Sequence, residues 1–481
     1  MRPVRAGLER RIPANPDNGR RMSTPQAKVR TFDRSLVEGP IGPAVWKIAW
    51  PTMLQNIIAG MQGIIDHAMV GHFVGYTANA AIGVSWQIVI VVIVFASTVF
   101  SGMGVLVARF AGANQPHMVN RVVYQSFLTA AGMSAVLGAA GWLAAPTLLG
   151  LVNAAPDVQA QALPFLRPML VGILGMMVFF MLSAAFRSAG DSRTPLRLGV
   201  MMTALTIVFN IVLIPRLGTF GAALGTIASS TLVSAYGLWR MTRPESVVHF
   251  EPGMSKKPDL AIIRELFRFG LPTGVQGIAM NVAGLLLLRF IGSLPQSAAA
   301  QAAYAVGYTE LFSLVTWTSV GLMGAAATIA GQNLGAGHPD RVVEGVRVAS
   351  RIGLLLAAGI GALFLVMPRQ LLAIFGLTDP AVSDLGAQLL RYLAVSGLFV
   401  TVALSYTGAL QGTGDTRGPL YISIVSQIIV PLGLCAVLQA MDRLTAGGIW
   451  TAIVLGHMTR CGLSVGRFRL QKWREIQVRI S

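Results

Sequence analysis

Residues 49–71 read AWPTMLQNIIAGMQGIIDHAMVG, an apolar run that holds a single carboxylate, Asp66, near its far end. A helix of about 20 apolar residues, rising about 1.5 Å per residue, crosses a hydrocarbon layer of roughly 30 Å. The run therefore predicts a membrane-spanning helix with Pro51 inside it. A carboxylate at that depth costs about 3 kcal/mol or more unless it is paired, hydrated or protonated. We expect Asp66 to be functional, and the alternative is a hydrated interfacial acid beside His67.

The composition extends this prediction to the whole chain. Of the 481 residues, 54% are hydrophobic and only 12% are charged, and the mean hydropathy is +0.65. Soluble domains carry about twice that share of charged residues, so we predict an all-α polytopic membrane protein. The net charge of +18 then reports orientation in the membrane rather than nucleic-acid binding. Cys435 and Cys461 lie far apart in sequence, which indicates neither a disulfide framework nor a metal site.

Twelve apolar runs follow a polar, Arg-rich segment, in which Met22 begins a more ordinary start than Met1. With a cytoplasmic amino terminus, most of the 37 Lys and Arg residues fall on the cytoplasmic side, as the positive-inside rule requires. Both termini are therefore predicted to be cytoplasmic. The expected spans are 44–71, 80–108, 122–144, 163–186, 195–214, 221–239, 266–292, 299–331, 343–367, 385–410, 419–439 and 446–465. The expected divisions are a basic tail 1–43, a lobe 44–240, a cytoplasmic linker 241–264, a second lobe 265–466 and a tail 467–481.

The chain contains an internal repeat, which is visible as three pairs of similar segments in the same order. The pairs are WPTMLQN (50–56) with LPTGVQG (271–277), FAGAN (110–114) with NLGAG (333–337), and FRSAGDSRTPL (186–196) with LQGTGDTRGPL (410–420). Each half holds six spans, and because six is even, both halves enter the membrane from the same side. We predict two parallel six-helix lobes around a central cavity. Asp191 and Asp415 are predicted turn acids beside Arg193 and Arg417.

A second acid, Glu310, lies inside the eighth run, where the same cost of burial applies. It is a candidate second-lobe site, and the alternative is a structural acid paired with Arg289. The repeat places Leu287 opposite Asp66, so the two halves are not chemically equivalent. We predict that the first half binds the coupling ion.

These features together resemble the multidrug and toxic compound extrusion (MATE) transporters, which belong to a superfamily that also contains lipid and polysaccharide flippases. The resemblance rests on Pro51 with Gln55, on IDHAMVG ending at Gly71, on the Gly-Ala turns near 112 and 335, on both GD(S/T)R segments, and on Asn210 followed by GAALGTIAS at 221–229. It implies two six-helix lobes, a cavity open alternately to each side, and export of organic cations in exchange for protons or sodium ions.

The resemblance also implies an ion-coupling site of Asp66, Asn210 and Thr226. Weaker candidates for the substrate cavity or a hinge are Pro51, Gln55, Gln276 and Met280. Many members carry further acids where this chain has Ile214, Met280 and about Val400. Sodium prefers several oxygen ligands, so protons are the predicted coupling ion, sodium at Asp66 is the alternative, and no other metal or cofactor is expected.

The predicted function is therefore export of amphiphilic organic cations by a monomer in the bacterial inner membrane, with the lipid bilayer around it and no nucleic-acid partner. The rival function is a flippase for a lipid-linked or polyanionic molecule, which needs cations around the cavity. Arg167, Arg289, Arg391 and Arg460 lie in or near spans but occur singly. An enzyme needs a polar catalytic constellation, and the sequence contains none. The aromatic and methionine candidates for the cavity wall are Trp86, Met177, Phe180, Trp317 and Met323, and the alternative, expected for most of them, is a lipid-facing or core position.

Overall fold

Helices form every regular element in the part of the chain that the structure describes. This computed structural model describes residues 32–480 except 152–155, 244, 251–252, 254, 256 and 479. The first half contains α1 (Ser35–Glu38), α2 (Ile41–Phe73), α3 (Tyr76–Gly112), α4 (Pro116–Leu151), α5 (Pro156–Val171), α6 (Ile173–Ser188) and α7 (Arg193–Met241). The second half contains α8 (Leu260–Gly292), α9 (Ser297–Tyr304), the π-helix η1 (Ala305–Leu311), α10 (Ser313–Gly335), α11 (Pro339–Val366), α12 (Pro368–Ile374), α13 (Pro380–Gly412), α14 (Arg417–Ser423), the π-helix η2 (Ile424–Ile429), α15 (Val430–Ala440), α16 (Ala446–Arg469) and the 3-10 helix η3 (Lys472–Glu475).

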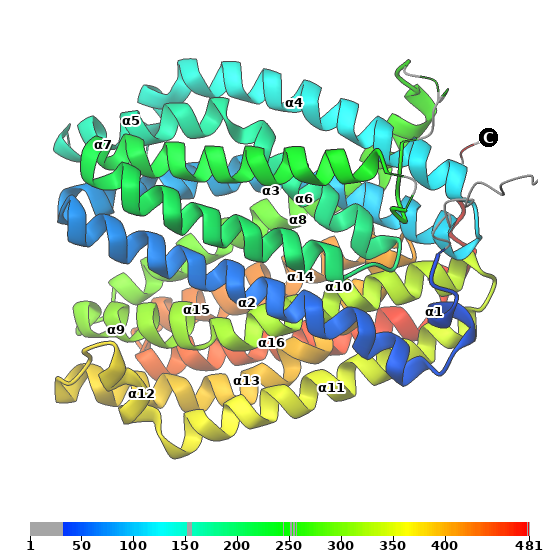
Figure 1. Cartoon of the computed structure of the whole chain (residues 1–481). Helices are drawn as coiled ribbons and strands as arrows, with labels where there is room; N and C mark the ends of the chain where they lie inside the picture. Colours follow the sequence, from blue (N-terminus) through cyan, green and yellow to red (C-terminus); the bar gives the residue numbers. More distant parts are fainter. Residues whose placement is uncertain are drawn as a thin grey trace, which may run out of the picture.

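Most of these helices run side by side along one bundle (Figure 1). Within the described residues, eight helices are long and apolar enough to cross a membrane, or nine when α5 and α6, which meet at 52°, count as one bent span. Helix α7 doubles back at Gly218, where the backbone has a φ of 58°, a value that glycine adopts without strain. Helix α7 therefore supplies two crossings. The second crossing of α7 together with α2 and α16 brings the number of crossings in the described part of the chain to twelve.

The helix ends follow local sequence signals. The Asp259 carboxylate accepts hydrogen bonds from the backbone N–H groups of Ala261 and Ile262 at the start of α8, and Asp379 caps α13 in the same way. Such caps satisfy backbone donors that the helix itself leaves free. These capped starts separate the long apolar runs into the crossings described above.

The two halves contact each other through equivalent helices. The first long helix of each half packs against the second crossing of the other half, so α2 lies on α10 and α8 lies on α3. The approach is close: a Cβ atom on Gly102 would lie 2.0 Å from the Leu266 carbonyl oxygen, and one on Gly321 would lie 2.6 Å from the Met53 Cα. Exchange of the halves maps one contact onto the other, as expected for parallel repeats.

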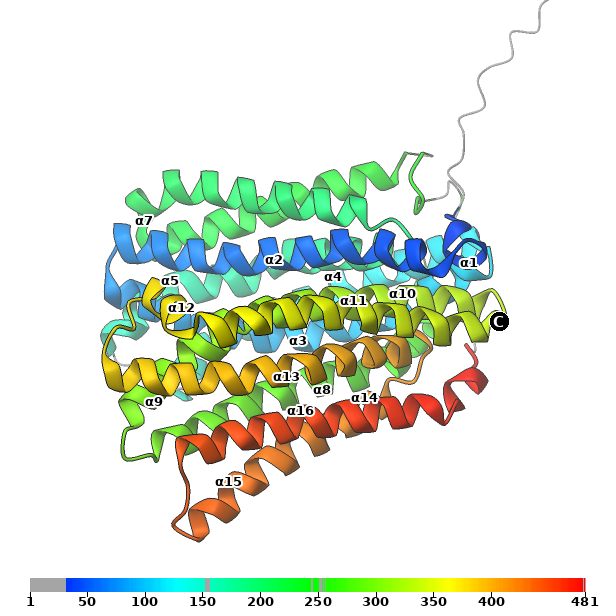
Figure 2. The same ribbon diagram turned by 90° about the horizontal axis from the view of Figure 1, so that it is seen from below.

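Helix α1 and the carboxyl-terminal segment lie at the same end of the bundle (Figures 1 and 2), here called the α1 end; the opposite end is the α9 end. The predicted basic tail lies mostly outside the described residues, but Leu36 in α1 is buried. The predicted carboxyl-terminal tail is folded onto the bundle. Trp473 is buried and stacks on Phe468 at 5.0 Å, and the Arg109 guanidinium donates to the Ile476 carbonyl oxygen.

The repeated GD(S/T)R turns lie at the α1 end. Asp191 accepts hydrogen bonds from the Thr194 backbone N–H at 3.1 Å and from its hydroxyl at 2.7 Å. Asp415 accepts from the Gly418 N–H at 3.0 Å and from the Arg467 Nε at 2.8 Å. Both are turn acids, as predicted, and α16 brings a further partner, Arg467, to Asp415 from 52 residues away.

Candidate functional site

A cavity of about 770 Å³ lies between the lobes, among α2, α3, α6, α7 and α10, and we call it the main cavity. Helix α2 supplies most of its polar side chains, which include Gln55, Asn56, Gln62 and Asp66. The remaining wall is largely apolar and aromatic: Trp86, Ile90, Ile93, Met176, Phe179, Phe180, Met202, Val320 and Met323. Apolar walls with a few convergent polar groups are typical of small-molecule binding sites.

Asp66 lies toward the α9 end of this cavity and is held by side chains of two helices. The Asn210 amide Nδ2 on α7 donates to the Asp66 Oδ1 at 2.9 Å. Gln62, one turn before Asp66, also hydrogen-bonds the carboxylate, and the Thr203 hydroxyl donates to the Gln62 Oε1 at 2.9 Å. This network links α2 to the first arm of α7 through the carboxylate.

The second arm of α7 positions Asn210. Asn210 is 1% exposed, and a Cβ atom on Gly225 would lie only 2.1 Å from its Oδ1. A glycine is therefore needed for Asn210 to reach Asp66. Thr226 follows Gly225 in sequence, but the Thr226 hydroxyl donates to the Ala222 carbonyl oxygen at 3.2 Å. The Thr226 side chain does not line the main cavity. The structure thus brings Asp66 and Asn210 together and places the Thr226 hydroxyl on its own helix.

Glu310 lies in η1, the first of two π-helical segments of the second half. It does not line the main cavity, and the ion pairs of the described residues do not include one between Glu310 and Arg289. Short π-helical segments are frequent at functional sites. Its role as a second-lobe site stays a prediction.

Gln55 is the one weaker candidate that lines the main cavity, and Pro51 precedes the cavity residue Thr52. Gln276 is buried away from the main cavity, where its amide donates to the Ser423 hydroxyl at 2.7 Å. Met280 also lies outside the cavity wall.

Some of the aromatic and methionine candidates line the main cavity and others do not. Trp86, Phe180 and Met323 line the cavity, although most of these five side chains were expected to face lipid or the core. The Met177 sulfur accepts a hydrogen bond from the Ser134 hydroxyl, and Trp317 packs on Gly60, where a Cβ atom would lie 2.2 Å from the indole. Neither of these two side chains belongs to the cavity wall.

Two further residues were missed as site candidates. Gln62 carried a usable signal, because residues four apart on a helix lie on the same face. Arg187 lies just past the expected span 163–186, but the structure places it in the last turn of α6, where it lines the main cavity. No group of three or more His, Cys, Asp or Glu side chains in the described part of the chain is arranged to hold a metal ion.

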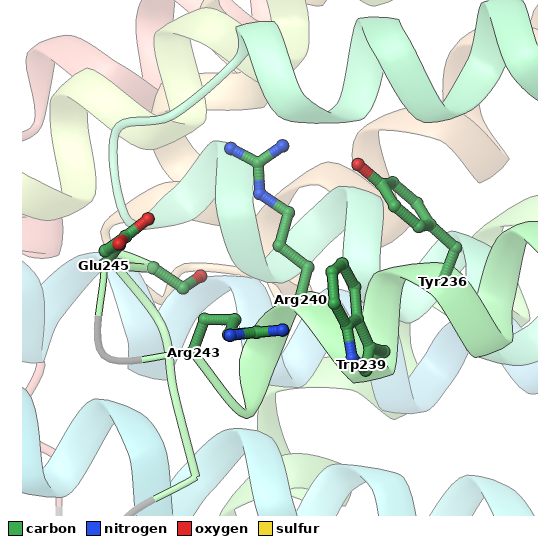
Figure 3. A pocket seen from close by; sticks show the side chains of 6 residues that line it. Tyr236, Trp239, Arg240, Arg243 and Glu245 are labelled. Carbon is green, nitrogen blue, oxygen red and sulfur yellow. The ribbon is translucent and has the colours of Figure 1, made fainter.

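A separate surface pocket of about 460 Å³ lies at the α1 end of α7 (Figure 3). Tyr236, Trp239, Arg240, Arg243 and Glu245 line it, and the Arg243 guanidinium lies over the Trp239 ring at 4.7 Å. Exposed Trp and Tyr side chains beside arginines are typical of the boundary between lipid and water. This pocket therefore belongs to the rim of the bundle and not to the space between the lobes.

The sequence and the structure were compared with known proteins. The MatE family profile matches residues 51–213 and again 272–437, once in each half. "Probable multidrug resistance protein NorM" of Thermotoga maritima is 26% identical over 439 residues, which are 89% of this chain and 92% of that relative. A protein of the same name from Deinococcus radiodurans is 28% identical, over 88% of this chain and 94% of that relative.

Solved structures show the same fold. An outward-facing multidrug resistance MATE family transporter of the MOP superfamily superposes with a TM-score of 0.86 at 19% identity, covering 93% of this chain and all of that chain. A MOP superfamily transporter from Pyrococcus furiosus, described as having a binding pocket of reversed polarity, gives a TM-score of 0.85 at 19% identity, with 93% and 100% coverage. The predicted fold of twelve membrane helices in two six-helix lobes is confirmed.

Proposed function

Because the chain belongs to the MatE family, we propose that it is a secondary antiporter that exports amphiphilic organic cations in exchange for protons. The observation that supports this most directly is the position of Asp66, the one carboxylate among the described residues that line a largely apolar and aromatic cavity of about 770 Å³. A carboxylate attracts an organic cation, and aromatic faces add cation–π attraction. Relatives that cover most of the chain are named multidrug resistance proteins.

The surroundings of Asp66 favour protons over sodium ions as the coupling ion. The side chains of Asn210 and Gln62 hydrogen-bond the carboxylate, and the Thr226 hydroxyl is directed to a backbone carbonyl. A hard cation such as sodium prefers several converging oxygen ligands. A proton on Asp66 removes its charge and so its attraction for a cation, which makes proton and substrate compete for the carboxylate as the cavity opens alternately to each side.

The orientation follows from charge. Arg34, Lys47, Arg193, Arg240 and Arg264 all lie in segments at the α1 end. Positive flanking charge stays in the cytoplasm, so we place the α1 end there and Asp66 toward the periplasmic half of a bacterial inner membrane. We expect the monomer to contain the complete site, because α2 and α7 of one chain supply the whole Asp66 network.

The test is ethidium accumulation in bacterial cells that lack their major pumps. The comparison uses the parent protein, Asp66→Asn at matched expression, and an empty vector. We expect the parent to lower accumulation and the variant to match the vector. Equal activity of parent and variant would remove Asp66 from the mechanism. A parent that does not lower accumulation would favour a flippase or a transporter of narrow specificity.

Proteoliposomes separate the two coupling ions. A pH gradient without sodium is expected to drive ethidium movement by the parent, and a sodium gradient at constant pH is not. The reverse result would assign sodium to the Asp66 site.

A further inference from the structure

A smaller cavity of about 270 Å³ continues the main cavity toward the α1 end, and we call it the inner chamber. The two spaces share Phe180, Arg187, Met323 and Gly324 on their walls. Hydroxyl and amide side chains also lie on the wall of the inner chamber: Ser97, Ser101, Ser188, Thr273, Thr328, Gln411 and Thr416. The Ser97 and Thr328 hydroxyls donate to backbone carbonyl oxygens of their own helices. The Thr273 hydroxyl is buried and has no hydrogen-bond partner.

Arg187 is the one charged residue among the described residues that line the inner chamber. No hydrogen bond or ion pair of its guanidinium occurs in the described part of the chain. Arg187 Nε lies close to Gly324, where a Cβ atom would be 3.3 Å from it, and Thr52 lies on the same glycine at 3.5 Å. An enclosed cation without a partner is costly, so such groups are normally paired.

The acid on the main cavity wall is too far away to neutralise Arg187. Asp66 and Thr52 are 14 residues apart on α2, which is about 21 Å along a helix axis. The negative group thus lies toward the α9 end of the continuous space, and the positive group lies where the main cavity joins the inner chamber. Among the described residues, the wall of the inner chamber offers the Arg187 guanidinium and neutral polar groups but no carboxylate.

We propose that the inner chamber is a binding site for an anionic group, a carboxylate or a similar oxyanion, held by Arg187 with the unpartnered Thr273 hydroxyl as a further donor. A guanidinium presents five N–H donors in a planar fork that matches two oxygens of an oxyanion. The volume admits such a group together with part of a molecule, while the remainder extends into the main cavity. This inference rests on the proposed export function and adds zwitterionic amphiphiles to its substrates.

Two dyes that differ in one group test the proposal. Rhodamine 110 carries a free carboxyl group, and rhodamine 123 is its methyl ester. Binding of each to purified, detergent-solubilised protein is followed by fluorescence anisotropy for the parent, Arg187→Gln, Arg187→Lys and Arg197→Gln. Arg197 is exposed on α7 and lines neither space, so it is the matched control.

We expect Arg187→Gln to lower the affinity for rhodamine 110 relative to rhodamine 123 by about tenfold or more, because a charge-assisted hydrogen bond contributes about that factor. Arg187→Lys should restore part of the ratio, and Arg197→Gln should leave it unchanged. The source of the anion is tested with inorganic phosphate, which should raise the melting temperature of the parent but not of Arg187→Gln if a free anion binds.

If Arg187→Gln loses the preference for rhodamine 110, the anion site is supported and its occupant is the substrate carboxylate. If Arg187→Gln loses the rise in melting temperature with phosphate, the anion site is supported and its occupant is a free anion. If the dye ratio and the effect of phosphate are the same in parent and Arg187→Gln, the proposal is wrong. Phosphate needs no exported substrate, so that arm still reports on the inner chamber if neither rhodamine binds and the export function itself fails.

Discussion

The first lobe keeps its intramembrane carboxylate beside open space, whereas the second lobe encloses its buried cation among aromatic rings. Asp66 lines the main cavity and is reached by the Asn210 amide. Arg460 on α16 is 6% exposed, lines neither cavity, and leaves its Nε without a partner. At the repeat position of Asp66, the second lobe has Leu287, which belongs to its apolar core.

Aromatic stacking accounts for the closed centre of the second lobe. Tyr304 stacks on Tyr308 at 4.9 Å and on Trp450 at 6.3 Å, and Phe312 stacks on His457 at 6.0 Å. The His457 Nδ1 is hydrogen-bonded to the Ser396 hydroxyl. The two lobes thus share a helix arrangement while the bulk of their side chains decides which one has room for a ligand.

The largest effect on ethidium export is expected from adding a methyl group at Gly225, next to Asn210. In Gly225→Ala the new Cβ would lie 2.1 Å from the Asn210 Oδ1, so the amide must move away from Asp66. Loss of this hydrogen bond to a charged group should lower ethidium export by about tenfold. The measurement is initial export rate per molecule of folded protein in proteoliposomes.

The matched control for that variant lies in the second lobe. Gly433 is also a helical glycine, but a Cβ atom there meets no atom within 4 Å. Gly433→Ala should export ethidium at the parent rate. Equal rates for both variants would show that the Asn210–Asp66 contact is not needed and would break the proposed difference between the lobes.

The second prediction compares the repeated turns. Arg467→Gln removes the partner of Asp415, which is 5% exposed, whereas the bonds of Asp191 to other described residues stay within its own turn. Because Arg467 is about one-third exposed and solvent screens the pair, we expect a loss of about 1–3 kcal/mol in stability. Asp191→Asn should cost about 1 kcal/mol or less, as for loss of a cap. Melting temperatures of the purified variants decide, and a larger loss in Asp191→Asn would reverse the comparison.

The third prediction concerns the enclosed cation. Met is shorter than Arg but keeps much of its apolar stem and carries no charge. Arg460→Met therefore removes a buried cation that has no ion pair among the described residues, and it leaves a smaller void than Ala does. We expect unchanged stability or a gain of up to about 2 kcal/mol, measured as melting temperature, and Arg460→Ala should be less stable than Arg460→Met because it leaves a cavity. A marked loss of stability in Arg460→Met would mean that the guanidinium is needed to hold the second lobe together.

Local sequence patterns predicted the helices, the repeat and the importance of Asp66, because apolar run length and a lone intramembrane acid are visible along the chain. The grouping of Asp66 with Asn210 came from the resemblance to the MATE transporters and not from the residues alone. Arg187 was missed because the fourth run was expected to end at residue 186, whereas α6 continues to Ser188 and the opposing lobe covers it. The partner of Asp415 could not be predicted either, since Arg467 reaches it only through packing of α16. Thr226 lies next to the site in sequence, but a nearby backbone carbonyl sets the direction of its hydroxyl.

The smallest effect is expected from the second-lobe acid. Glu310 lies outside both cavity walls, so Glu310→Gln should change the ethidium export rate by less than twofold. The assay is the proteoliposome rate measurement at matched protein content, with Asp66→Asn as the inactive reference. A loss as complete as that of Asp66→Asn would show that η1 carries a second coupling site, reached in a conformation in which the second lobe opens, and that the two lobes share the coupling.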